Sequence, residues 1–298
     1  MTLNEQASFS QPHFHTTTTK PKNQKPAQAK SFVPVILIGI AVAYLALVLY
    51  IPAINVFFQA FKNGVGPFIS NLKHPNFVSA AKMTLLLASI AVPLNTIFGL
   101  CAAWAIARHN FPGRTLLLSI IDLPFSISPV VAGLMIVLLY GRNGWFGGWL
   151  QQHDIKIIFA VPGMVLATAF VTMPFVAREV IPVLEEFGKE QEEAAKTLGA
   201  KGWQIFWRIT LPNIRWGLLY GLILTNARAM GEFGAVSVVS GNIAGKTQSL
   251  PLFVEDAYKQ YETEAAYSAA VILALLAVVT LVLKEILERK TGAKSKIQ

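Results

Sequence analysis

Long apolar runs constrain this chain more than any other feature of its sequence. Six segments reach the length of roughly 20 apolar residues that a helix needs to cross a bilayer. Prolines inside these runs are compatible with spanning helices, because neighbouring helices or polar side chains can satisfy the freed carbonyl groups. The sequence therefore predicts an all-α membrane protein with six transmembrane helices. The expected spans are residues 33–61, 78–107, 116–140, 157–182, 216–240 and 265–283.

The overall composition agrees with a membrane protein. Hydrophobic residues make up 54% of the 298 residues and charged residues only 14%, whereas a soluble domain carries about a quarter charged residues. The first thirty residues are polar and include TTTTKPKNQKPAQAK, a composition that cannot bury a core. We therefore expect a disordered cytoplasmic tail at 1–31, a transmembrane domain at 32–290 and a basic tail at 291–298.

The distribution of basic residues predicts the orientation of the spans. With six spans both termini lie on one side, together with the 108–114 turn and the 178–215 loop. That side carries 17 Lys and Arg residues, and the opposite side carries 7. Cytoplasmic loops of membrane proteins are enriched in basic residues, so both termini are predicted to be cytoplasmic. Because topology accounts for the net charge of +9, a nucleic-acid partner is not expected.

One cytoplasmic loop, residues 183–213, contains a stretch that is neither a span nor a simple spacer. Good helix formers run from Glu185 to Leu198, interrupted only by Gly188. Gly199 occupies the position where a helix end adopts positive φ. Trp203 and the apolar residues after it predict a second short helix that Pro212 prevents from simple extension. The residues alone leave two interpretations open, an interfacial hairpin at the headgroups or a face that another protein approaches.

The second interpretation is favoured by a resemblance. The segment EAAKTLGAKGWQIFWRITLP is similar to the EAA motif of the permeases of ATP-binding-cassette (ABC) importers. That resemblance implies a type I importer permease fold, and a coupling helix that docks onto a cytoplasmic ATPase subunit. The motif positions present here are Glu193, Ala194, Ala195, Gly199, Ile209, Leu211 and Pro212.

We find no sequence motif for catalysis or for ATP binding. The run GNIAGKT at 241–247 has one residue too few between its glycines to be a P-loop, and it is expected on the outer face. The histidines of HFH at 13–15 lie in the polar tail and are expected to be incidental. The chain is therefore predicted to be a non-enzymatic subunit without a cofactor, with ATP bound by a partner ATPase.

Ionisable residues inside the spans are expensive to insert and are therefore candidate functional groups. Arg228 and Glu232 lie four residues apart in the fifth expected span and can pair on one helix face. A structural bridge and a polar patch on a translocation path are both compatible with this spacing. Asp122 lies near the cytoplasmic interface and is expected to be solvated or to pair with Arg108 or Arg114. Ser126 and Ser128, beside prolines that free carbonyl groups, are better path candidates.

The surrounding sequence RAMGEFGAVSVVSG is similar to the fifth span of permeases for sulfate, thiosulfate, molybdate and tungstate. Over roughly 260 residues the chain resembles the W-type (CysW-type) permease subunits of the sulfate/thiosulfate importers. The resemblance favours a translocation path. The path residues that we expect are Arg228, Gly231, Glu232, Phe233, Gly234, Ser126 and Ser128.

The leading hypothesis is thus a permease subunit that moves sulfate or thiosulfate across the bacterial inner membrane. The partners that it implies are CysA-like ATPase subunits, a second permease subunit that is a T-type paralogue, and a periplasmic sulfate-binding protein. A molybdate or tungstate permease is the first alternative. An ion-coupled secondary carrier is a weaker one, because the spans show no obvious inverted repeat. A passive scaffold would leave the coupling motif unexplained.

Overall fold

The computed structural model describes residues 33–295, and the regular elements in that range are all helical. The HFH histidines and the expected tail at 1–31 lie outside the described residues. The chain divides into two compact units between Ile51 and Pro52. In the first unit, α1 (Val33–Leu45) continues into a π-helical turn at Ala46–Tyr50. The apolar side chains of this unit from Ile36 onward are almost all exposed, as expected of a helix surface that faces lipid.

The second unit is built around the helices α4, α8 and α11. They span Pro75–Arg108, Val161–Glu186 and Leu211–Met230. The three pack closely because glycines lie where they cross: a Cβ atom added to Gly99 of α4 would lie 2.7 Å from Cβ of Val176. On α11, Gly217 and Gly221 face α8 in the same way. Small residues of this kind allow helix backbones to approach one another in a membrane.

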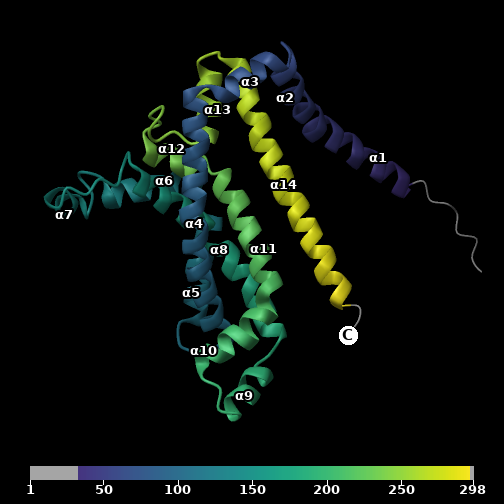
Figure 1. Cartoon of the computed structure of the whole chain (residues 1–298), viewed down its shortest axis with the longest axis vertical. Helices are drawn as coiled ribbons and strands as arrows, with labels where there is room; N and C mark the ends of the chain where they lie inside the picture. Colours follow the sequence, from purple (N-terminus) through teal and green to yellow (C-terminus); the bar gives the residue numbers. More distant parts are fainter. Residues whose placement is uncertain (1–32, 296–298) are drawn as a thin grey trace, which may run out of the picture. The chain divides into compact units, whose positions relative to one another are not determined.

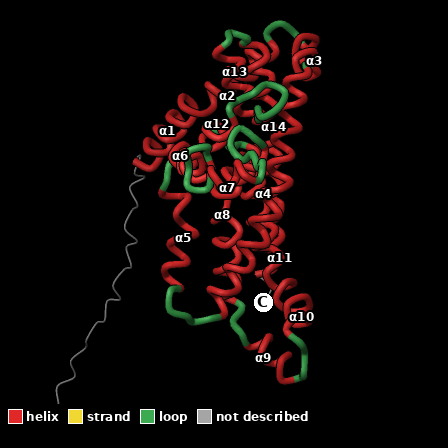
Figure 2. The backbone as a smooth tube through the Cα atoms, turned by 90° about the vertical axis from the view of Figure 1, so that its left-hand side faces the viewer, coloured by secondary structure: helices red, strands yellow, loops and turns green. Residues whose placement is uncertain are grey.

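Several of the remaining elements, among them α5, α12, α13 and α14, pack against this three-helix core. Figure 1 shows α9 and α10 at one end of the core and α3 and α13 at the other, and Figure 2 shows the same order from the side. Their bounds are α2 (Ile51–Phe61), α3 (Val65–Lys73), α5 (Arg114–Ser126), α6 (Pro129–Tyr140), α7 (Gly147–Gln152), α9 (Glu190–Thr197), α10 (Gly202–Ile205), α12 (Gly234–Ser240), α13 (Leu250–Lys259) and α14 (Thr263–Ser295). Because α14 continues through Ser295, it includes residues 291–295 of the expected basic tail.

Four helices of the described chain are long and apolar enough to span a membrane. They are Ile36–Phe61, Pro75–Arg108, Val161–Glu186 and Thr263–Ile286, and the pair α5 and α6 makes a fifth if it is one bent span. The axes of α5 and α6 differ by 111°, so the third expected span is not straight. Ser128 has extended geometry, with ψ 134°, as expected of a residue before a proline.

The fifth expected span is also interrupted. Helix α11 ends at Met230 and α12 begins at Gly234, with three residues between them. Gly231 and Gly234 flank this break, and glycine weakens a helix interior. The six-span count therefore stays a prediction.

The expectation that Pro212 ends a short helix was wrong. Helix α10 continues without interruption through a π-helical turn at Phe206–Thr210 into α11. The N–H of Leu211 donates to the carbonyl of Phe206, which is the wider spacing of a π turn. Pro212 consequently lies in the first turn of α11, where a proline ring and its missing N–H are tolerated.

Candidate functional site

The 183–213 loop forms two short helices that meet at Gly199. Acidic side chains occupy the first turn of α9 and Lys196 its last turn, an arrangement that complements the helix dipole. Gly199 has φ +83°, so the prediction of a positive φ at this residue is confirmed. On either side of it, Leu198 is 88% exposed and Trp203 is 71% exposed. The turn thus presents large apolar side chains that nothing in the described chain covers.

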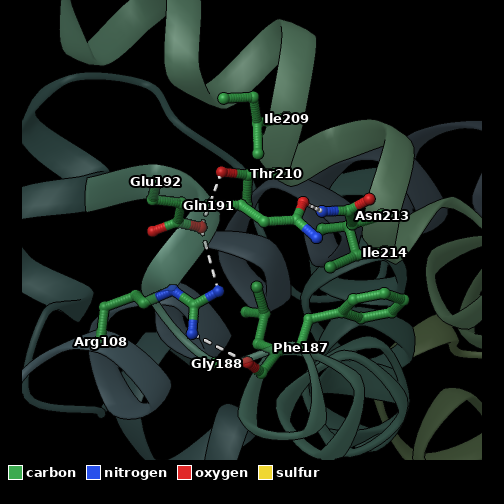
Figure 3. A pocket seen from close by; sticks show the side chains of 10 residues that line it. Arg108, Phe187, Gly188, Gln191, Glu192, Ile209, Thr210, Asn213 and Ile214 are labelled. Atoms are coloured by element: carbon green, nitrogen blue, oxygen red, sulfur yellow. Dashed lines mark hydrogen bonds and ion pairs between the residues drawn. The ribbon is translucent and has the colours of Figure 1, made fainter. Parts of the chain in front are cut away.

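A buried ion pair anchors this loop to the end of α4. Arg108 Nη2 lies 3.0 Å from Oε1 of Glu192, and the same oxygen accepts a hydrogen bond from the Thr210 hydroxyl at 2.9 Å. Arg108 Nη1 also donates to the carbonyl of Leu184 at 2.8 Å. Figure 3 shows the guanidinium group between these acceptors. The side chain of Arg108 is 7% exposed and that of Glu192 is 18% exposed, so both charges are largely withdrawn from solvent.

Further polar contacts surround the anchor. Asn213 donates to Gln191 at 2.8 Å, and Lys189 donates to the carbonyl of Arg108 at 2.7 Å. Arg114, after the α4–α5 turn, forms an ion pair with Glu185 at 2.7 Å. These contacts join the α4–α5 turn, the end of α8 and the start of α11 around α9. The loop at residues 183–213 is therefore a folded joint, which the core helices α4, α8 and α11 hold in position.

The residues of the EAA motif divide between the two sides of this joint. Ile209 lines the small pocket around Arg108, and Leu211 packs against the core cluster of α4, α8 and α11. Glu193, Ala194, Gly199 and Pro212 are exposed, and Ala195 is half-buried. The motif therefore supplies both an inner face that holds the joint and an outer face that is free.

The interrupted fifth span contains the second set of expected residues. Arg228 Nη1 lies 2.6 Å from Oε2 of Glu232, so the predicted pair forms. Glu232, however, lies beyond the end of α11, and its Oε1 accepts the backbone N–H of Ala235 at 2.9 Å. The Glu232 side chain is 1% exposed and that of Arg228 is 34% exposed. Glu232 thus holds the guanidinium and the start of α12 at the same time.

The two breaks in the expected spans lie next to each other. A Cβ atom added to Gly234 would lie 2.9 Å from Cβ of Pro129, and one added to Gly133 would lie 2.6 Å from the carbonyl oxygen of Ala235. Ser126, Ser128, Gly231 and Phe233 are exposed. The expected path residues of α5, α6 and α11 are thereby brought to one region.

For Asp122 the expected partners were wrong. It pairs with Arg178 of α8, whose Nε donates to Oδ1 at 2.6 Å, because Arg108 and Arg114 are engaged by Glu192 and Glu185. The contact between Arg108, Glu192 and Thr210 was not predicted from the sequence. The signals available in the sequence were Arg108, a basic residue at the end of the second apolar run, and Glu192, the acid directly before the EAA motif.

Comparisons with known proteins agree with these features. The family described as "Binding-protein-dependent transport system inner membrane component" matches residues 95–293. The chain belongs to this family. A relative named "Sulfate transport system permease protein CysW" from Synechocystis sp. is 72% identical over 257 residues, which cover 86% of this chain and 93% of the relative. Its Escherichia coli K12 namesake is 54% identical over 85% of this chain and 87% of its own length.

Two further similarities are to a different sulfate permease subunit and to a solved transporter structure. The E. coli K12 "Sulfate transport system permease protein CysT" is 41% identical over 80% of this chain and 86% of its own length. Among solved structures, a bacterial alginate ABC transporter in complex with alginate pentasaccharide-bound periplasmic protein matches with a TM-score of 0.73. That match covers 87% of this chain and 95% of the other at 18% identity, so it shows a shared fold.

Replacing Glu192 should destabilise the permease more than replacing its neighbour. Glu192→Ala leaves Arg108 buried without its carboxylate, and breaking a buried pair from one side costs about 3 kcal/mol or more. Glu193→Ala removes an exposed side chain and should change stability by less than about 0.5 kcal/mol. Thermal unfolding of the two detergent-purified variants measures the difference. Equal midpoints for both would contradict the anchoring role of Glu192.

Proposed function

We propose that this chain is the membrane-spanning permease subunit of an ABC importer that moves sulfate or thiosulfate into the cytoplasm. The observation that carries the proposal is its 72% identity, over nearly the full length of both chains, to a protein named as a sulfate permease. The joint at α9 and α10 supports the proposal, because it has an inner face held by the core helices and an exposed outer face. A transport subunit that is driven by a separate ATPase subunit needs such a surface for that contact. The same architecture serving molybdate or tungstate is the alternative.

In this proposal the chain crosses the bacterial inner membrane six times. The bent α5–α6 pair and the interrupted α11–α12 pair each contribute one crossing beside the four continuous helices. Both termini and the α9–α10 joint face the cytoplasm, as the excess of basic residues on that side predicts. The chain itself hydrolyses nothing.

The proposed partners follow from the family. CysA-like ATPase subunits bind and hydrolyse ATP, a T-type paralogue supplies the second permease subunit, and a periplasmic binding protein delivers the anion. The exposed face of the joint, with Ala194, Leu198 and Gly199, is the proposed contact with the ATPase. Movement of that face reaches the core through Glu192 and Arg108, since their bond ties α9 to the end of α4.

The Arg228–Glu232 pair is the proposed contact for the passing anion. A guanidinium group offers several N–H donors in a planar fork that suits tetrahedral oxyanions. Its counter-charge limits the net positive potential, so that the site attracts the dianion without retaining it. The neighbouring residues Gly231, Phe233, Gly234, Ser126 and Ser128 complete the proposed path.

Transport by the assembled complex tests the function itself. The chain co-purified with its ATPase, its second permease subunit and the binding protein should drive ATP-dependent uptake of labelled sulfate into proteoliposomes. Excess unlabelled thiosulfate should compete, and molybdate should compete only weakly. Uptake of molybdate in preference to sulfate would assign the chain to the alternative.

Bulky substitutions at the joint should uncouple the permease from its ATPase. Gly199→Val places a β-branched residue at φ +83°, a conformation that costs such residues of the order of 1–2 kcal/mol. Ala195→Trp enlarges the side of α9 that should approach the partner. Both variants should insert normally while ATPase co-purification and uptake fall together. Full retention of both properties would instead indicate a hairpin that only rests on the membrane.

The path assignment predicts a specific pattern among three variants, Arg228→Gln, Glu232→Gln and the double variant. Two unit charges near 4 Å interact by about 4 kcal/mol at an effective dielectric of 20, so each single variant strands a charge and should lower membrane abundance. Glutamine at 232 keeps an oxygen that can accept the Ala235 N–H, which preserves the start of α12.

The double variant separates a brace from an anion contact. It should regain abundance because no unpaired charge remains, but sulfate uptake should stay low because no cation faces the anion. Abundance by immunoblot and uptake in the same vesicles measure the two properties. Normal uptake by the double variant would show that Arg228 only braces the helices.

A further inference from the structure

A further ion pair, Arg178–Asp122, joins α8 to α5. It belongs neither to the joint nor to the proposed path residues. Arg178 of α8 donates to both carboxylate oxygens of Asp122 on α5, through Nε at 2.6 Å and through Nη2. The Arg178 side chain is 54% exposed, and that of Asp122 is 29% exposed. Its Nη1 has no hydrogen-bond partner in the described part of the chain. The apolar helix α8 therefore carries an exposed cation, Arg178, whose Nη1 can still donate a hydrogen bond.

The position of Arg178 along α8 argues against a side chain buried in lipid. Its helix, Val161–Glu186, is long and apolar enough to span a membrane, and Arg178 lies about two turns before the end at Glu186. Ionisable side chains at such positions almost always face the bundle interior or a water-filled cavity. This tendency favours a guanidinium that faces either an aqueous path or another subunit.

The packing of α8 shows which of its sides carries Arg178. Val176 and Ala177 lie against Gly99 of α4, and Val183 lies against Gly217 of α11. Arg178 is left on the remaining side, where α8 meets Asp122 of α5. Figure 2 shows α5 and α11 on either side of α8, consistent with the contacts of α8 to both.

The contacts between α8 and α11 give the depth of Arg228 relative to that of Arg178. On α11, Gly221 contacts Val176 of α8, and Arg228 follows Gly221 by seven residues, which is about two helical turns on the same face. Because α8 and α11 are antiparallel, Arg178 lies on the other side of the Gly221 contact, toward the α9–α10 end. A rise of 1.5 Å per residue separates the two positions by roughly 13 Å along the helices.

We propose that Arg178 is a second contact for the transported oxyanion, closer to the α9–α10 end than Arg228. This inference rests on the proposed function. The two pairs share one design: the carboxylate is more buried than the guanidinium, at 1% against 34% and at 29% against 54%. In each, the acid holds the cation from behind and leaves its outer side available to a dianion.

Restoring a cation by chemical modification tests the proposal. Cys101 is the only cysteine of the chain, so Cys101→Ser with Arg178→Cys places a single thiol at the site. In the assembled complex this variant should lose sulfate uptake by about tenfold or more, the scale of one hydrogen bond to a charged group. Aminoethyl methanethiosulfonate, which adds a cation, should restore most of the uptake. Sulfonatoethyl methanethiosulfonate, which adds an anion, should not, and sulfate should slow both modifications.

Two comparisons exclude a purely structural role. Lys259→Cys in the same background removes another ion-paired cation, that of the exposed Lys259–Glu255 pair of α13, and neither reagent should change its uptake. Arg178→Gln combined with Asp122→Asn leaves no unpaired charge, so membrane abundance should be normal while uptake remains low. Normal uptake by this double variant would overturn the proposal.

The remaining outcomes are equally decisive. A thiol at position 178 that neither reagent modifies in the abundant, assembled complex would show that another subunit covers the site. Equal rescue by both reagents would show that bulk rather than charge matters. If the wild-type complex imports no sulfate, the proposed function fails and the sulfate contact fails with it. A wild-type complex that imports sulfate while the variants behave like wild type overturns only the role of Arg178.

Discussion

The close packing of α4, α8 and α11 through glycine is the constraint on which the rest of this structure depends. At Gly99 there is no room for a Cβ atom beside Val176, and Gly221 comes almost as close from the other side. In a membrane no hydrophobic effect drives helices together, so association relies on close van der Waals contact and internal hydrogen bonds. The buried Asn95 of α4, which donates to Ala169 and Thr172 of α8, adds such bonds. Arg108, Arg178 and Arg228 each lie on one of the three helices that this contact holds together.

The same contact explains why the 183–213 loop is held in a fixed position. Arg108 is the last residue of α4, and its guanidinium is almost fully buried between α8 and the loop. A buried charge of this kind tolerates little displacement, because losing its partners would leave it desolvated and unpaired. Glu192 therefore cannot move far without α4. The large apolar side chains on the opposite face, Leu198 and Trp203, are exposed.

The features that the sequence predicted are local, and those that it missed are long-range. The positive φ of Gly199 and the pairing of Arg228 with Glu232 depend on residues a few positions apart, where spacing is informative. The Arg108–Glu192 contact joins residues 84 positions apart, and the Asp122–Arg178 contact joins residues 56 apart. Nothing in a single sequence selects such partners among several charges.

The bend between α5 and α6 and the break between α11 and α12 could not be predicted for a different reason. A proline inside an apolar run is compatible with both a straight and a broken span, and tertiary packing decides between them. Here α12 lies against α6, with Gly133 against Ala235 and Gly234 against Pro129. Helix α6 makes that contact only because it turns away from α5. Pro212 shows the converse: it lies within a continuous helix, because the π turn before it moves the proline into a first turn.

The arrangement of charge in the Arg228–Glu232 and Arg178–Asp122 pairs bears on how a dianion could cross. A lone arginine in a low-dielectric interior would attract a dianion strongly and release it slowly, since the interaction grows as the dielectric constant falls. A carboxylate that is less exposed than its guanidinium partner reduces the net charge of each pair while the outward N–H donors remain available. Transport requires binding strong enough to admit the anion and weak enough to release it. Two compensated cations at different depths, at Arg228 and at Arg178, would divide that requirement between two modest sites.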